Sequence, residues 1–330
     1  MAIVRSMQNH LPAIVCLYLA ILPAVLPSYF IATEVVILAI ATLASVFLLG
    51  RLGHLSFGQA AFFGLGSYVS GYAAKFWGLG IVPSLALSAV LGTAVAAAIG
   101  WLALRRHGLY FIMLTLAFGQ LCYHLAFALE PLTGGERGLL DIPRGSVGWS
   151  PMAASMEAPL PFYCMCAIVL SLLFYMLRRI ELSPFGFALA SIRVNESRAS
   201  AVGYDTHMLK TLAFAISGGV TAIAGGLNAF FLNSSPLSSI DFTLSLQIAV
   251  TSIIGGWTSL FGAILGATFY VVLSGVLAEH LSRWMLIYGV LLIVIVLFMR
   301  GGLWGGITSL ASLLRSTKGG QSDTSELRIS

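Results

Sequence analysis

Residues able to carry out chemistry are few in this chain of 330 residues, and their spacing fits no catalytic motif. The sequence contains neither G-x-x-x-x-G-K-S/T nor H-E-x-x-H, so it lacks a phosphate-binding loop and a helical zinc motif. Ser217-Gly218-Gly219 resembles part of an ATPase signature but lies in an apolar stretch. Cys164-x-Cys166 lacks the second pair that a structural zinc site needs, and the histidines are scattered. We therefore expect no catalysis, no metal and no cofactor.

Some polar residues lie inside apolar stretches, where polar groups tend to face a bundle interior or a solute pathway. From depth and polarity alone, Ser56, Gln59, Gln120 and Tyr123 are interpreted as candidates for a substrate pathway. The alternative is close helix packing with internally satisfied polar groups. The apolar stretches contain no ladder of carboxylates and no Asp–Lys pair, which argues against a proton-coupled carrier.

Two glycine-rich runs stand out, at Gly53–Tyr68 and Ile254–Gly266. A glycine inside a helix costs roughly 1 kcal/mol relative to alanine. In lipid it is tolerated where helices pack closely or where a broken helix lines a cavity. We expect packing roles, with a turn or hinge at Gly255-Gly256. The structural glycines are Gly53, Gly58, Gly64, Gly66, Gly255, Gly256, Gly262 and Gly266.

The stretch from Arg178 to Lys210 carries five basic and three acidic residues inside an otherwise apolar chain. Ser183-Pro184 is typical of a helix N-cap followed by proline at the first helical position. Asn195 can cap a second short helix, and Gly203 suits the left-handed residue that closes it. Two short helices would form a docking surface, whereas a solvated loop would only set topology by its charge. The pattern leaves both alternatives open.

Composition places these residues in a polytopic membrane protein, because 58% are hydrophobic and only 9% are charged. Soluble domains carry about 25% charged residues. We expect an all-α membrane bundle of about ten (eight to ten) transmembrane helices, each of roughly 20 apolar residues. The ranges 57–76 and 242–255 are the least secure, since the first is rich in small residues and the second is short. The ten ranges are 11–27, 30–49, 57–76, 81–104, 109–129, 159–177, 209–231, 242–255, 259–278 and 284–299.

Basic residues predict the orientation, because positive charge collects on the cytoplasmic side of membrane proteins. This rule places both termini and the 178–210 loop inside, leaves the 130–158 loop outside, and accounts for the net charge of +5 without nucleic acid. Residues 1–10 form the N-terminus, 11–305 the transmembrane domain, and 306–330 a tail expected to be disordered. With five helices in each half, the second half enters the membrane from the opposite side, as in an inverted-topology repeat. No repeat is visible at the level of residues. The cytoplasmic basic positions are Arg5, Arg51, Arg105, Arg106, Arg300, Arg315, Lys318 and Arg328.

Three motifs carry a resemblance to a known family. Gly53–Tyr68 is similar to S-L/F-G-Q-A-A-F-F-G-x-G-A/S-Y, and Ile254–Gly266 to I-G-G-x-G-S-L-x-G-x-x-x-G. Phe185–Gly203 is similar to G-x-A-L-x-A-I-R-x-N-E-x-x-A-x-x-x-G. Together they resemble the permease subunits of bacterial ABC importers for branched-chain amino acids, of the longer "M" type. Trp257-Thr258 departs from the pattern, and the solute stays open because similar families carry urea, short amides or other small solutes.

The resemblance implies a pathway subunit in the bacterial inner membrane, surrounded by lipid and paired with a second permease. Two separate ABC ATPase subunits would hydrolyse ATP, and a periplasmic solute-binding protein would deliver the solute. The segment Asn195–Gly203 would be the coupling helix. Ala199 and Ala201 would let it sit close in an ATPase cleft, and Gly203 would turn the chain back. Its polar contacts would be Arg193, Glu196 and Arg198.

Two other classes of function remain as alternatives. A self-sufficient channel or secondary carrier would move solute through this chain alone, driven by a gradient. A non-transport membrane scaffold would show no solute dependence.

Overall fold

The structure is a computed structural model that describes residues 15–23, 26, 28–105, 108–144, 158–280 and 301–306, with single positions between 286 and 293. Within these residues it is helical, with one isolated antiparallel bridge between Leu139 and Ser235. The prediction of an all-α bundle is confirmed there. The helices are α2 (Tyr29–Leu52), α3 (Gln59–Trp77), α4 (Ile81–Ala103), α5 (Leu109–Ala128), α6 (Glu130–Thr133), η1 (Gly135–Arg137), α7 (Pro159–Glu181), α8 (Pro184–Val194), α9 (Glu196–Ala201), α10 (Thr206–Leu232), η2 (Leu237–Ile240), α11 (Phe242–Gly255) and α12 (Leu260–His280).

Six of the described helices are long and apolar enough to cross a membrane: α2, α4, α5, α7, α10 and α12. The doubtful range 57–76 forms one unbroken helix of 19 residues, α3, although it does not belong to this apolar set. The doubtful range 242–255 coincides with α11, whose 14 residues are short for a full span. The predicted spans 11–27 and 284–299 fall largely outside the described residues. The total of ten therefore stays a prediction.

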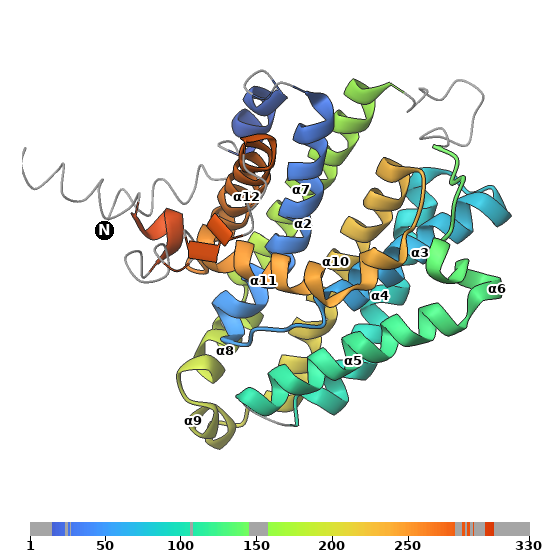
Figure 1. Cartoon of the computed structure of the whole chain (residues 1–330). Helices are drawn as coiled ribbons and strands as arrows, with labels where there is room; N and C mark the ends of the chain where they lie inside the picture. The colour runs from blue at the N-terminus through green and yellow to red at the C-terminus, as the bar shows by residue number, and fades with distance from the viewer. Residues whose placement is uncertain are drawn as a thin grey trace, which may run out of the picture.

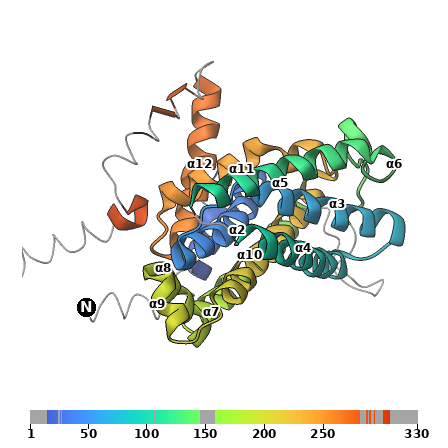
Figure 2. The same cartoon turned by 90° about the horizontal axis from the view of Figure 1, so that it is seen from below.

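Helices α2 and α10 form the centre of the bundle, and α2 lies in the middle of the view in Figure 2. In their most apolar 18-residue stretches, 83% of the residues of α2 and 78% of those of α10 are buried, against 22% for α5. Small residues make this close packing possible. A Cβ atom at Gly225 of α10 would collide with the Phe63 carbonyl of α3, and one at Gly66 of α3 with the Ala222 carbonyl of α10.

The two halves of the chain exchange partners across this centre. Helix α10 packs most extensively against α4 and α3, while α2 packs against α12 and also against α11. When the ten predicted spans are counted, α2 and α10 are the second helix of each half, and each contacts the third and fourth helices of the other half. Each central helix ends at a left-handed residue, Gly53 (φ 74°) after α2 and Asn233 (φ 52°) after α10. Such an exchange is expected of two related halves, and the inverted orientation of the repeat stays a prediction.

The segments that follow the two central helices, residues 53–58 and 233–241, lie where each half of the chain packs against the other. The amide nitrogen of Ala60 donates to Ser245 Oγ at 2.9 Å, and the rings of Phe57 and Phe242 lie 5.9 Å apart. Farther along α3, the hydroxyls of Ser67 and Ser235 are 2.7 Å apart. Non-helical backbone at membrane depth is tolerated where protein buries it, and these contacts supply that cover.

The described basic residues of the predicted cytoplasmic side gather at one end of the bundle. Arg51 lies in the last turn of α2 and Arg178 in that of α7, while Lys210 lies near the start of α10. The rings of Trp101 and His207, 4.5 Å apart, bring the end of α4, and with it Arg105, to the start of α10. The structure therefore agrees with the prediction that these basic residues lie on one side of the membrane. The assignment of this end to the cytoplasm stays a prediction.

Candidate functional site

The basic elbow, residues 178–210, folds as two short helices, α8 and α9, at the lower end of the molecule in Figure 1. Ser183 Oγ accepts a hydrogen bond from the Gly186 amide at 3.4 Å, and Asn195 Oδ1 accepts from the Arg198 amide at 3.0 Å. Gly203 has a φ of 101°. Both predicted caps are confirmed, so the elbow is a folded element rather than a solvated loop.

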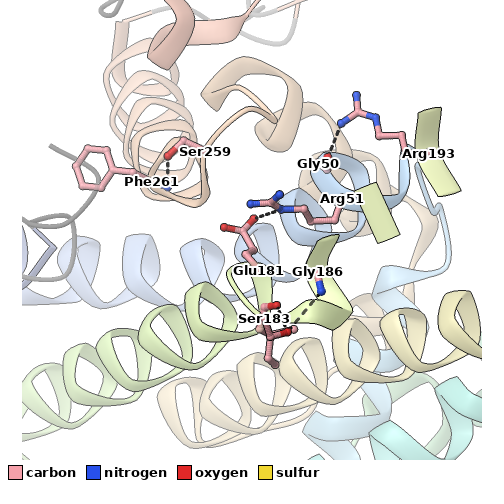
Figure 3. Close-up of polar contacts among 9 residues, drawn as sticks. Gly50, Arg51, Glu181, Ser183, Gly186, Arg193, Ser259 and Phe261 are labelled. Carbon is pink, nitrogen blue, oxygen red and sulfur yellow. Dashed lines mark hydrogen bonds and ion pairs between the residues drawn. The ribbon is translucent and has the colours of Figure 1, made fainter. Parts of the chain in front are cut away.

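Helix α8 is anchored to the body of the bundle. Leu189 and Ile192 are buried, and α8 contacts α2, α7, α9 and α10. At its end the Arg193 guanidinium donates to the Gly50 carbonyl of α2. Close by, Arg51 Nε donates to Glu181 Oε1 at 3.1 Å, which joins α2 to α7, as Figure 3 shows. The elbow is thus fixed to two long helices by polar contacts and to the core by apolar ones.

Helix α9 is anchored to the start of α10. Lys210 Nζ lies 2.6 Å from Glu196 Oε1, and the side chains are 2% and 32% exposed, respectively. A buried ion pair is costly to break, because removal of one partner leaves an unpaired charge in the protein. Ala199 on the same short helix is only 6% exposed and belongs to the hydrophobic core. A force applied to α9 would therefore reach α10 directly.

The outward face of the elbow is apolar and basic. Val194 is 87% exposed and Val202 is 80% exposed, although both are β-branched apolar residues, and Arg198 lies exposed between them in the sequence. Sequence reasoning missed the two valines. The available signal was their apolar type within a stretch that is otherwise polar or small. We call Val194, Arg198, Ala201 and Val202 the exposed ridge.

The residues predicted to contact an ATPase do not share one environment. Asn195, Arg198, Ala201 and Gly203 are exposed. Arg193 and Glu196 already bind groups of this chain. Ala199, which was also expected to sit close in an ATPase cleft, has its side chain buried in this chain's own core.

The candidate pathway residues Ser56 and Gln59 are both buried and hydrogen bonded. Gln59 is 1% exposed; its Nε2 donates to Ser217 Oγ at 3.0 Å, and its Oε1 accepts from Thr221 Oγ1 at 2.8 Å. Ser217 Oγ in turn donates to the Ala44 carbonyl at 3.0 Å. Ser56 Oγ accepts from the Gly58 amide at 3.2 Å. These bonds tie α2, α3 and α10 together and favour the packing alternative.

The other two candidates, Gln120 and Tyr123, lie on α5 and are partly exposed. Helix α5 runs along the lower right side of the bundle in Figure 1 and packs lightly against α3, α4, α11 and η2. Tyr123 contacts the small apolar cluster of Ala126, Leu237 and Ile240. Of the four candidates, these two retain side-chain surface that a solute could reach.

The structural glycines fall into two groups. Gly53 and Gly256 have φ angles of 74° and 100°, which favour glycine, and they end α2 and α11. The others lie where a Cβ would press on a neighbouring element; they are Gly58, Gly64, Gly66, Gly255, Gly262 and Gly266. Both groups fit packing and hinge roles.

Among the described residues, no group of three or more His, Cys, Asp or Glu side chains is placed to hold a metal ion. The four cysteines, Cys16, Cys122, Cys164 and Cys166, are unbridged.

A family model described as "Branched-chain amino acid transport system / permease component" matches residues 29–297. The high-affinity branched-chain amino acid transport system permease protein LivM of Escherichia coli (strain K12) is 25% identical over 292 residues, covering 83% of this chain and 69% of that protein. The LivM protein of Salmonella typhimurium shows the same identity and coverage. The probable branched-chain amino acid transport permease protein LivH of Methanocaldococcus jannaschii is 24% identical over 236 residues, covering 69% of this chain and 72% of that protein. No solved structure matches the chain.

Proposed function

Since the chain belongs to the family of branched-chain amino acid transport permeases, we propose that it is the membrane pathway subunit of an ATP-binding-cassette importer. It translocates branched-chain or other hydrophobic amino acids that a periplasmic binding protein delivers. The bacterial inner membrane is its location, with the basic elbow and both termini in the cytoplasm. The chain itself has no phosphate-binding loop, so separate subunits supply ATP hydrolysis.

The anchored elbow is the observation that carries this proposal. An ATPase can work a membrane pathway only through a rigid element that it grips from outside the membrane. The elbow offers exposed Val194, Arg198 and Val202 to a partner, while Lys210 and Ala199 fix α9 to the body of the bundle. Two exposed valines beside an arginine are the composition of an interface core, where apolar side chains and arginine are enriched.

A second permease subunit would cover part of α5. Its Leu109, Tyr110 and Met113 are exposed large apolar side chains, and the helix is the least buried of the six apolar spans. Lipid could cover an apolar face equally well, so the exposure of α5 does not by itself require a second subunit. The second subunit is therefore part of the proposal.

The docking role is tested by co-purification of the chain with its ATPase subunits. Val202→Asp places a charge on the exposed ridge, and we expect it to reduce co-purification at least tenfold. Leu140→Asp is the matched control, because it places the same charge on an exposed leucine at the opposite end of the bundle. The proposal predicts that the control retains its ATPases. Equal retention by both variants would refute docking at the ridge.

The main alternative is an importer of the same class for a different solute, because the elbow supports the class and does not indicate the solute. Uptake of urea, a short amide or a sugar in place of leucine would keep the importer class and replace the solute.

A further inference from the structure

Asp241 carries a carboxylate at the middle depth of the bundle. It stands between η2 and α11, and α11 crosses the middle of the molecule in Figure 1. On one side of it, Ile240 fills the space that a Cβ at Gly64 of α3 would need. On the other side, Ser245 Oγ accepts from the Ala60 amide of α3 at 2.9 Å. Asp241 therefore lies level with the first two turns of α3.

A chain of hydrogen bonds relates this level to the length of α2. Gln59, the first residue of α3, donates to Ser217 Oγ, which donates to the Ala44 carbonyl of α2. At 1.5 Å per residue, Ala44 lies about 13 Å from the basic end of α2 and about 24 Å from its other end. Helix α2 is one of the apolar spans, and the hydrocarbon core of a bilayer is about 30 Å thick. Asp241 therefore lies near the middle of the membrane.

The carboxylate of Asp241 keeps capacity for a ligand. Its Oδ2 accepts from Thr243 Oγ1 at 2.6 Å, and no ion pair within the described part of the chain involves it. It makes no capping hydrogen bond at the start of α11. The residue is partly exposed, so a solute can reach it. A charged side chain at membrane depth is costly, and such side chains face a solute pathway or pair with another group.

Apolar rings lie beside this carboxylate. Phe242 follows Asp241 in the chain, and its ring lies 5.9 Å from the ring of Phe57. Both phenylalanines are partly exposed. A carboxylate next to apolar surface suits a ligand that joins a cation to an aliphatic body, as leucine does with its ammonium group and its side chain.

The other sources of a partner for this carboxylate fit less well. Urea, a short amide or a sugar brings no cation and would leave the charge unpaired. The charged headgroup of a lipid stays at the membrane surface, far from the middle of the hydrocarbon core. A basic side chain of a second permease is the competing partner, because it could also lie at this depth.

We propose that Asp241 binds the ammonium group of the transported amino acid at the middle of the membrane, while Phe57 and Phe242 contact its aliphatic body. The inference rests on the proposed function and deepens it, because it assigns recognition of the amino group to the permease. The sequence gave no signal for this role. A span that begins at residue 242 places Asp241 at a membrane surface, whereas the structure places the start of α11 at middle depth.

The first test removes the charge and keeps the shape. Asp241→Asn retains an oxygen that can accept from Thr243. In the complete importer reconstituted into liposomes, it should lower leucine uptake at least about tenfold, because a charge-assisted bond is lost. The melting temperature should stay equal or rise, since a neutral amide costs less than a carboxylate at this depth. Asp241→Glu, which keeps the charge, should retain more uptake than Asp241→Asn.

Asp141→Asn is the matched control, because it makes the same change at an exposed aspartate outside the helices. It should leave leucine uptake near wild type. Wild-type uptake by Asp241→Asn would overturn the proposal. A fall in uptake that is matched by a fall in the melting temperature would also overturn it, since the carboxylate would then be structural.

A second test measures access to the site directly. Thr243 is exposed beside the carboxylate, so Thr243→Cys, with Ala at the four native cysteines, offers a thiol there. A cationic methanethiosulfonate in water should modify this thiol in the complete importer, and leucine should slow the reaction at least threefold. Addition of Asp241→Asn should abolish the protection by leucine. Leu172→Cys, at an exposed position on the outside of α7, should stay unmodified.

A thiol at position 243 that stays unmodified, or that reacts at the same rate with and without leucine, would contradict the proposal. Loss of the second permease from co-purified Asp241→Asn would also contradict it, because the carboxylate would then pair with a basic side chain of that subunit. A wild-type importer that moves no leucine would instead refute the proposed function.

Discussion

Lys210 of α10 is a buried cation that pairs with the more exposed Glu196 of α9, and this difference in burial decides what each mutation should do. Glu196 is one-third exposed and can reach water, whereas Lys210 is almost fully buried. Loss of the glutamate therefore strands a charge in the protein, and loss of the lysine strands much less.

We expect Glu196→Ala to destabilise the chain by about 2–4 kcal/mol and Lys210→Met by about 1 kcal/mol. The double variant should be more stable than Glu196→Ala alone. Thermal unfolding of the purified protein across this double-mutant cycle measures the coupling. Additive effects, or a larger loss for Lys210→Met, would show that the pair is not a buried one.

Gln59 provides the test between packing and pathway at the level of a single side chain. Gln59→Leu removes bonds to Ser217 and Thr221, which should cost about 1–3 kcal/mol because two buried hydroxyls lose a partner. Uptake should fall only in proportion to the amount of folded protein. A variant of normal abundance and melting temperature that transports nothing would return Gln59 to the pathway.

The role of a residue could be predicted where its partner is close in the sequence, and could not where its partner is distant. Ser183 and Asn195 act within three residues of themselves, so their caps could be predicted from residue type. Ser217 is 158 positions away from Gln59, and no local pattern reveals that contact. The burial of Ala199 likewise depends on tertiary packing, which no local pattern reveals.

At the scale of elements, the tightest contact is that between α3 and α10. Its geometry requires glycine at Gly225, since a Cβ there would meet the Phe63 carbonyl. Backbone atoms cannot move aside as a flexible side chain can.

We expect Gly225→Ala to lower the melting temperature of the detergent-solubilised protein by several degrees, because α3 and α10 must separate. Gly275→Ala in α12 is the matched control: nothing lies within 4 Å of a Cβ at that position. Helix propensity should make this control neutral or stabilising by up to about 1 kcal/mol. A Gly225→Ala variant as stable as its control would contradict the close packing of the two helices.

Element boundaries were predicted well where composition changes sharply. The predicted range 242–255 coincides with α11, and the predicted range 81–104 with α4 to within one residue. The segment 53–58 was assigned in part to a span, because its apolar and small residues do not show that the chain is non-helical there. Its cover comes from Thr115 and Phe242, which both contact Phe57 and lie far along the sequence.

For the whole molecule, composition predicts that the chain is a membrane protein, but it does not predict how the two halves pack together. The exchange of partners between α2 and α10 involves packing between segments that share no visible sequence repeat. We interpret this packing as a route by which movement of the elbow reaches the membrane helices. The elbow is attached to α2, α7 and α10, and α10 packs closely against α3, so we expect a tilt of the elbow to be transmitted to these helices.

The central claim is that this chain is a passive pathway worked by an ATPase through the elbow. Reconstitution into liposomes with its partner permease, the ATPases and loaded binding protein tests it most directly, by measuring leucine uptake with ATP, with ADP, and by this chain alone. The account predicts uptake only in the complete system with ATP. Uptake by this chain alone, or uptake that proceeds equally with ADP, would contradict it.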